Sequence, residues 1–185
     1  MKRSFSVRNI AVCGVCIALC YILPLALHPF ELGTALSPMH IPVLLCGLVC
    51  GGGYGLVCGI AGPILSYLLS GMPAPPYLFT MIPELAVYGL ASGLLMKLVR
   101  TRFTIADLYI SLLSAMVLGR IVGGVVKVLF YTGGQAYGLS MWVSAYFIST
   151  LPGIICHIIL LPLLYLTLSK AKLIPCRYPK GATHG

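Results

Sequence analysis

Three charged residues lie inside long apolar stretches of the sequence: Glu84, Arg120 and Lys127. A charged side chain within a membrane span is costly to bury, so each of them marks a candidate functional site. Arg120 and Lys127 are seven residues apart, and a helix would present both on one face. Two cations and one anion would form a net positive pocket. Such a pocket suits a ligand with a carboxylate or another anionic or electron-rich group.

The expected depths of these side chains favour a shared pocket. At about 1.5 Å per helical residue, Glu84 lies roughly 12 Å and Arg120 roughly 16 Å inside the outer ends of their spans, and Lys127 about 6 Å. Alternatively, Glu84 and Arg120 pair only to neutralise each other, while Lys127 extends outward to the membrane surface. Gly123 and Gly124 leave a gap between the two cations, which either a neighbouring helix or a ligand could fill.

Aromatic residues of the last apolar segment extend the candidate substrate-binding set. Trp142 and Tyr146 are four residues apart, and Ser149 or Thr150 and then Gly153 continue the same stripe on a predicted helix. For Trp142, the alternative is an aromatic belt at the membrane interface. Tyr146 lies one turn deeper, and its hydroxyl needs a partner away from water. We therefore expect Tyr146 to line the pocket.

Two further residues, His40 and Tyr88, belong to the candidate set. His40 lies in the stretch SPMHIP, where we expect the chain to re-enter the membrane above the pocket. It would cap a bound ligand there, and the alternative is an exposed histidine in a simple turn. His157, deeper on the last segment, is interpreted as a packing histidine with satisfied ring nitrogens. Asp107 is interpreted as a helix cap, since it follows Thr104 at capping-box-like spacing.

The composition indicates that lipid is the solvent for most of the surface. Hydrophobic residues make up 59% of the chain and charged residues 8%, with a mean hydropathy of +1.03. A soluble protein of average composition carries about 25% charged residues. Since one span needs roughly 20 mostly apolar residues, the length allows about six. We predict an all-α integral membrane protein that forms a single domain over residues 1–185, in which the many glycines allow close helix packing.

Breaks in the apolar pattern place the predicted spans. They run over about residues 9–27, from 41 to a turn at 50–55, from that turn to 70, over 77–99 and 104–131, and from a turn at 132–138 to 169. The second and third segments look short for full spans. They are therefore candidates for tilted or re-entrant helices.

Basic residues predict the orientation. Ten of the 12 Lys and Arg residues lie in three clusters: before the first span, at 97–102, and after the last span. The positive-inside rule places all three in the cytoplasm. Both termini, with short basic tails at 1–8 and 170–185, are then cytoplasmic. The loops at 28–40, 71–76 and 132–138, which hold no Lys or Arg, lie outside.

Seven of the eight cysteines lie in apolar runs, which indicates small buried hydrophobic residues rather than a disulfide framework. Cys13 and Cys16 have the spacing of a redox or metal site, but no second pair accompanies them. Met39 and His40 stand next to each other without a second histidine at ligand spacing. We expect no metal site.

These features resemble the substrate-binding S components of energy-coupling factor (ECF) vitamin transporters. The resemblance is carried by six spans in under 200 residues, and by the stretches SPMHIPV, FTMIPELAVYGLASGLL (79–95) and GRIVGG (119–124). It implies that the chain captures a vitamin from outside. It also implies delivery through a transmembrane T component driven by two ATPase subunits. The family docks its T component through an Ala-x-x-x-Ala motif in span one. Here Gly14 and Ala18 match that motif with Gly in the first position, and the alternative is ordinary packing within the chain.

The predicted function is high-affinity capture of a water-soluble vitamin or precursor, with a weak preference for pantothenate over riboflavin or folate-like molecules. The chain has no G-x-x-x-x-G-K-[ST] motif. It is therefore expected to need no cofactor of its own, with ATP hydrolysed by partner subunits in a bacterial plasma membrane. The alternative is a stand-alone ion-coupled transporter that uses Glu84 as its proton carrier. An intramembrane serine enzyme built on Ser92 is the less favoured third hypothesis, and no enzymatic activity is expected.

Overall fold

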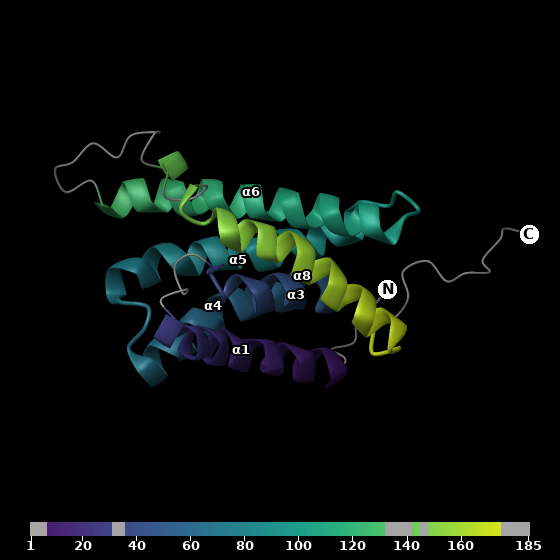
Figure 1. The fold of residues 1–185 in the computed structure, drawn as a ribbon, viewed down its shortest axis with the longest axis horizontal. Coiled ribbons are helices and arrows are strands. Elements are labelled where there is room, and N and C mark those ends of the chain that lie inside the picture. Colours follow the sequence, from purple (N-terminus) through teal and green to yellow (C-terminus); the bar gives the residue numbers. More distant parts are fainter. Residues whose placement is uncertain (1–6, 31–35, 132–141, 145–147, 175–185) are drawn as a thin grey trace, which may run out of the picture.

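A computed structural model describes residues 7–30, 36–131, 142–144 and 148–174 (Figure 1). Within these ranges the chain forms helices and no strands. Five helices are long and apolar enough to cross a membrane, and a sixth is shorter. In chain order the elements are α1 (Val7–Leu27), the 3₁₀ turn η1 (His28–Phe30), α3 (His40–Cys50), α4 (Gly52–Ser70), α5 (Pro75–Leu98), α6 (Thr104–Tyr131) and α8 (Leu151–Lys170).

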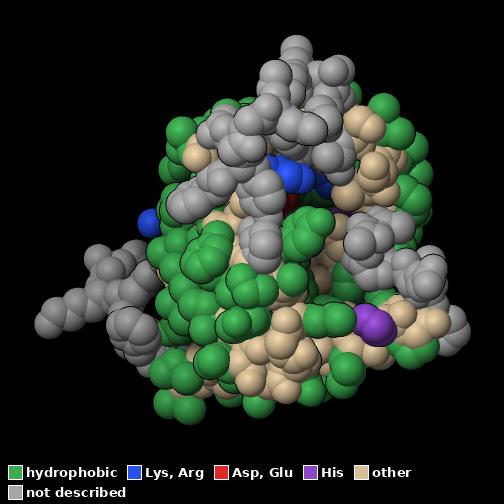
Figure 2. Space-filling view, turned by 90° about the vertical axis from the view of Figure 1, so that its left-hand side faces the viewer, with side chains coloured by type: hydrophobic (Ala, Val, Ile, Leu, Met, Phe, Trp, Pro, Cys, Tyr) green, Lys and Arg blue, Asp and Glu red, His purple; other side chains and the backbone are tan. Residues whose placement is uncertain are grey.

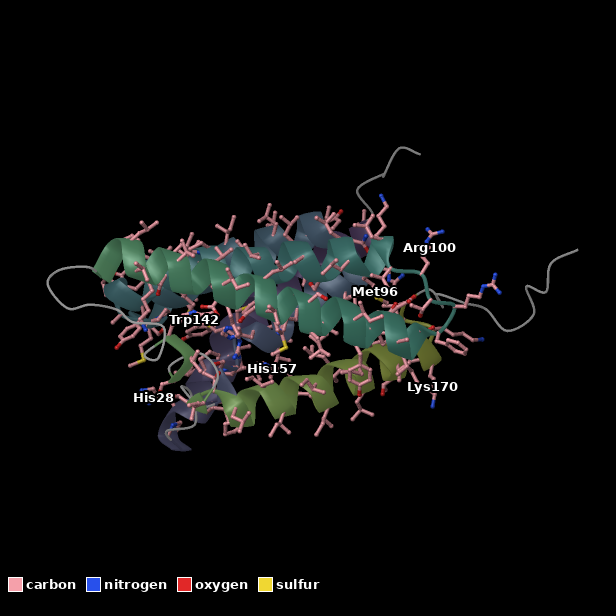
Figure 3. The ribbon with its side chains drawn as sticks, turned by 90° about the horizontal axis from the view of Figure 1, so that it is seen from above. His28, Met96, Arg100, Trp142, His157 and Lys170 are labelled. Carbon is pink, nitrogen blue, oxygen red and sulfur yellow. The ribbon has the colours of Figure 1, made fainter. Side chains whose placement is uncertain are left out.

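Helix α5 lies at the centre of the bundle, where it packs against α3, α4 and α6. Helix α1 covers α3 and α4 on one side, and α8 packs against α3 and α6 on another (Figure 1). The chain passes back and forth, so that α1 begins and α8 ends at the same end of the bundle. Figure 3 shows Arg100 and Lys170 at this end, and His28 and Trp142 at the opposite end. The alternation agrees with the predicted spans, while the cytoplasmic assignment of the basic end remains a prediction from charge.

Glycines allow α4 and α5 to lie backbone against backbone. A Cβ on Gly55 would overlap the carbonyl of Gly89, and a Cβ on Gly89 would overlap the carbonyl of Gly55. One turn along, Gly59 faces the backbone of Leu85 in the same way. Small residues at four-residue spacing permit this approach in membrane helices. The predicted use of glycine for close packing is therefore confirmed at this interface.

The break between the second and third apolar segments is shorter than expected. Only Gly51, with φ 98°, separates α3 from α4, and residues 52–55 already belong to α4. Helix α4 has 19 residues and can cross the membrane, so the prediction of a short third segment is wrong. The second segment is indeed short. The 11 residues of α3 extend about 16 Å, roughly half the thickness of the hydrocarbon core.

The last apolar segment is not one continuous helix, contrary to the sequence prediction. Trp142 lies in a short helical stretch, Ser149 and Thr150 form a turn, and α8 begins at Leu151. Pro152 explains the break, because it has no backbone N–H for a preceding turn and is well suited to the first turn of a helix. The predicted stripe from Trp142 to Gly153 is therefore interrupted.

Six cysteines lie in the core that α1, α3 and α4 share. They are unpaired and buried, as expected for small hydrophobic residues. They are Cys13, Cys16, Cys20, Cys46, Cys50 and Cys58. Asp107 is also structural: it is fully buried, and its Oδ1 accepts hydrogen bonds from Thr101 N (2.8 Å) and Thr101 Oγ1 (2.7 Å). This carboxylate holds the turn that precedes α6.

Candidate functional site

Glu84 on α5 and Arg120 on α6 face each other through the hydroxyl of Tyr88. The Tyr88 hydroxyl donates to Glu84 Oε1 at 2.9 Å and accepts a hydrogen bond from Arg120 Nε at 3.3 Å. Exposed fractions are 8% for Glu84, 1% for Tyr88 and 5% for Arg120. Glu84 and Tyr88 are four residues apart, so one helix presents both on the face that meets α6. The predicted proximity of the acid and the arginine is confirmed, with Tyr88 as the bridge.

His40 joins this group from a third helix. It is the first residue of α3, and its Nε2 lies 3.6 Å from Glu84 Oε1. Its Nδ1 lies 3.0 Å from the carbonyl oxygen of Ser37. Since a carbonyl only accepts, Nδ1 carries a proton, and Nε2 is left facing the carboxylate. A proton on either Nε2 or Glu84 makes that second contact favourable.

The structure places His40 deeper than the sequence suggested. Its side chain is 8% exposed, so the alternative of an exposed turn residue is wrong, while its contact with a ligand stays a prediction. The reason for this depth is the short length of α3, which begins within the bundle and places its first residue at the level of Glu84. His40 is part of the buried polar network (His40, Glu84, Tyr88 and Arg120).

Glycines on α6 seat the other members of the site. Positions for a Cβ on Gly119 and Gly124 are occupied by the ring of Tyr88 and the indole of Trp142, respectively. A Cβ on Gly123 would lie 2.7 Å from Glu84 Oε2. The gap predicted at Gly123 and Gly124 is therefore filled by side chains of the chain itself, those of Glu84 and Trp142.

Trp142 contacts the network through the backbone of α6. Its Nε1 donates to the carbonyl oxygen of Arg120 at 3.3 Å, and its side chain is half-buried. Lys127 lies two turns beyond Arg120 on α6 and is also half-buried. Figure 2 shows Lys or Arg side chains and an acidic side chain in a hollow at this end of the bundle. Tyr146 lies outside the described residues.

His157 on α8 is a member of the site that the sequence analysis assigned differently. Its ring stacks on that of His40, with centroids 5.9 Å apart. It is 1% exposed, and neither ring nitrogen has a hydrogen-bond partner within the described part of the chain. The expectation of a satisfied packing histidine is therefore wrong. The signal that could have found it was the one used for Glu84, a polar side chain in an otherwise apolar helix.

A comparison with known protein families covers most of the chain. The family model described as "ECF transporter, substrate-specific component" matches residues 8–165, which include every described residue of the site. The chain belongs to this family. Searches of curated proteins and of solved structures found no match. This ECF substrate-specific component is thus a multi-pass membrane protein and a transporter subunit rather than an enzyme. Ser92, considered above for catalysis, is fully buried and donates to the carbonyl of Gly89.

The first helix of this substrate-specific component has one buried and one exposed face. Cys13, Cys16 and Cys20 face the core, whereas Gly14 and Ala18 lie on the exposed side. A Cβ on Gly14 would meet nothing within 4 Å. No described part of the chain therefore packs against Gly14, which lies on the exposed face of α1.

Proposed function

We propose that this chain captures a small water-soluble vitamin or vitamin precursor with an anionic group from outside a bacterial cell. The observation that carries the proposal is the buried network of His40, Glu84, Tyr88 and Arg120. The carbonyl oxygen of Arg120 in this network accepts a hydrogen bond from Trp142, which Figure 3 shows at the end of the bundle opposite the basic residues Arg100 and Lys170. By the positive-inside rule that end faces the exterior.

The charges of the site favour an anionic ligand. Among the described residues of the site, Arg120 and Lys127 provide two cations against one acid, Glu84. An arginine side chain matches a carboxylate through two parallel hydrogen bonds, and these are strong in a buried site. Pantothenate, with a carboxylate, an amide and hydroxyl groups, is the preferred candidate. Riboflavin and folate-like molecules are the others.

Delivery is proposed to require a T component and two ATPase subunits. Gly14 and Ala18 support this part, because they form a small-residue face on α1 that another helix could approach closely. The chain would then supply recognition, and the partners would supply the energy of ATP hydrolysis.

One observation favours a second candidate, a stand-alone ion-coupled transporter. His40 Nε2 lies 3.6 Å from Glu84 Oε1, so a titratable group faces the buried acid that would act as the proton carrier. Family membership favours the capture subunit.

The direct test is mass spectrometry of what co-purifies with the detergent-solubilised chain, followed by titration of the identified compound. We expect a vitamin or precursor with an anionic or electron-rich group, bound by the chain without its partners. A chain that retains no such compound and binds none of the three vitamins would contradict the proposal.

A further inference from the structure

The hydrogen bonding of His157 is not explained by the network described above. Among the residues that the structure describes, neither buried ring nitrogen has a hydrogen-bond partner, and the side chain is 1% exposed. The backbone at Leu36 and Ser37 lies close beside the ring, but it does not meet either nitrogen with the geometry of a hydrogen bond. A buried polar group that makes no hydrogen bond is destabilising, and in a native structure it calls for an explanation.

His157 extends the site by one ring. The centroids of Tyr88 and His40 are 5.0 Å apart, and those of His40 and His157 are 5.9 Å apart at an interplanar angle of 27°. The three rings come from α5, α3 and α8, in that order. Polar contacts connect the network as far as His40, whereas the ring of His157 offers polar atoms that no described residue uses. Figure 3 shows His157 nearer to Trp142 than to Arg100, so it lies toward the proposed outer end.

The position of α8 allows a ligand to reach this ring. Helix α8 packs against α3 and α6, less extensively than α5 packs against α4 and α6. Because the nitrogens are covered, a ligand contacts them only when α8 or the backbone at Leu36 and Ser37 shifts. A helix with limited packing is the element that moves at the lowest cost.

We infer that His157 hydrogen-bonds a neutral hydroxyl or amide group of the substrate, an inference that rests on the proposed function. A neutral imidazole presents one N–H donor and one acceptor. Its complement is a group that both donates and accepts, as hydroxyls and secondary amides do. Arg120 would hold the anionic end of the same molecule. The two contacts together would define a substrate with an acidic end and a neutral polar segment.

The test compares His157→Phe and His157→Asn with the parent chain. Phenylalanine keeps a ring and removes both nitrogens, while asparagine keeps a donor and an acceptor. Binding of pantothenate, riboflavin and folate, each of which carries hydroxyl or amide groups, is measured by calorimetry in detergent. Thermal unfolding of the vitamin-free proteins is measured on the same preparations.

We expect His157→Phe to bind the parent's vitamin at least about tenfold more weakly, and yet to unfold at a higher temperature. The higher stability follows because the substitution removes two buried atoms without partners. His157→Asn should recover part of the affinity. If His157→Phe binds as tightly as the parent, or is less stable without vitamin, this inference is wrong while the proposed function stands. A parent that binds none of the three vitamins would overturn both.

Discussion

Arg120 illustrates how a charged residue is accommodated within an apolar bundle. The Nε of Arg120 donates a hydrogen bond to the Tyr88 hydroxyl, which in turn donates to Glu84. The backbone carbonyl of Arg120 accepts a hydrogen bond from the indole of Trp142. Side chains from two other parts of the chain thus surround one residue of α6. A buried charge held in this way is strongly oriented, which is the property that a selective anion site needs.

Replacing Arg120 by alanine should weaken vitamin binding by about 1.5–3 kcal/mol, the value of a hydrogen bond to a charged group. Lys97→Ala is the matched control, because it removes an exposed positive charge at the opposite end of the bundle. Calorimetry with the identified vitamin provides the measurement. Thermal unfolding of both variants shows whether Arg120→Ala also lowers the stability of the protein, because the substitution removes the cation that is linked to Glu84 through Tyr88. If Arg120→Ala binds as well as the parent, Arg120 is structural and the anionic ligand loses its main support.

At this scale the sequence predicts residue types better than it predicts partners. Glu84 and Arg120 were identifiable because a charge in an apolar run is rare and costly. The bridging role of Tyr88 depends on how α5 packs against α6, where Gly119 and Gly123 of α6 make room for the side chains of Tyr88 and Glu84. His40 and His157 were assigned less well. Their burial follows from where α3 begins and how α8 packs, and no local pattern encodes either.

Close packing of α4 and α5 is the main feature at the scale of the elements. Gly55→Ala should destabilise the bundle by about 1–3 kcal/mol, the usual cost of overpacking, because the new Cβ overlaps the carbonyl of Gly89. Gly53→Ala, two residues earlier on α4, is the matched control, since its Cβ meets nothing within 4 Å. It should be neutral, or stabilising by up to about 1 kcal/mol. Equal shifts of the unfolding temperature in the two variants would show that this interface does not depend on glycine.

The exposed small-residue face of α1 gives the second prediction for an element. Gly14→Leu combined with Ala18→Leu should retain equilibrium binding of the vitamin and abolish ATP-dependent uptake with the T component and ATPases. The buried network is built by α3, α5 and α6, so binding should not respond to bulk on the outer face of α1. Thr167→Leu, on the exposed side of α8, adds bulk elsewhere and should leave uptake unchanged. Full uptake by the double variant would show that this face is not the docking site.

Helix boundaries were predicted best from the sequence where a proline or a glycine ends a helix. The boundary near Gly71 was predicted closely, because Gly71 takes the left-handed conformation that ends α4 and two prolines begin α5. The extent of α6 was also predicted closely. The glycines at positions 52, 53 and 55 predicted a turn, but residues 52–55 are helical. Tertiary contact with α5 overrides their low helix propensity there.

The whole molecule has two chemically different ends, and this polarity predicts its orientation. For cysteine labelling, Met72 is replaced by cysteine, because it lies in the turn between α4 and α5 and is 50% exposed. A membrane-impermeant maleimide should label it from outside intact cells. Arg100→Cys, exposed at the other end, should react only after the membrane is opened. The chain without an added cysteine gives the background, and the reverse labelling pattern would invert the topology.

Uptake in proteoliposomes tests most directly the claim that this chain is a capture subunit. The chain is reconstituted alone, and again with a T component and two ATPase subunits, and accumulation of the labelled vitamin is followed with and without ATP. We predict accumulation only in the complete assembly with ATP, while the chain alone binds the vitamin without transporting it. Accumulation by the chain alone, driven by an ion gradient, would contradict the account and support the ion-coupled transporter.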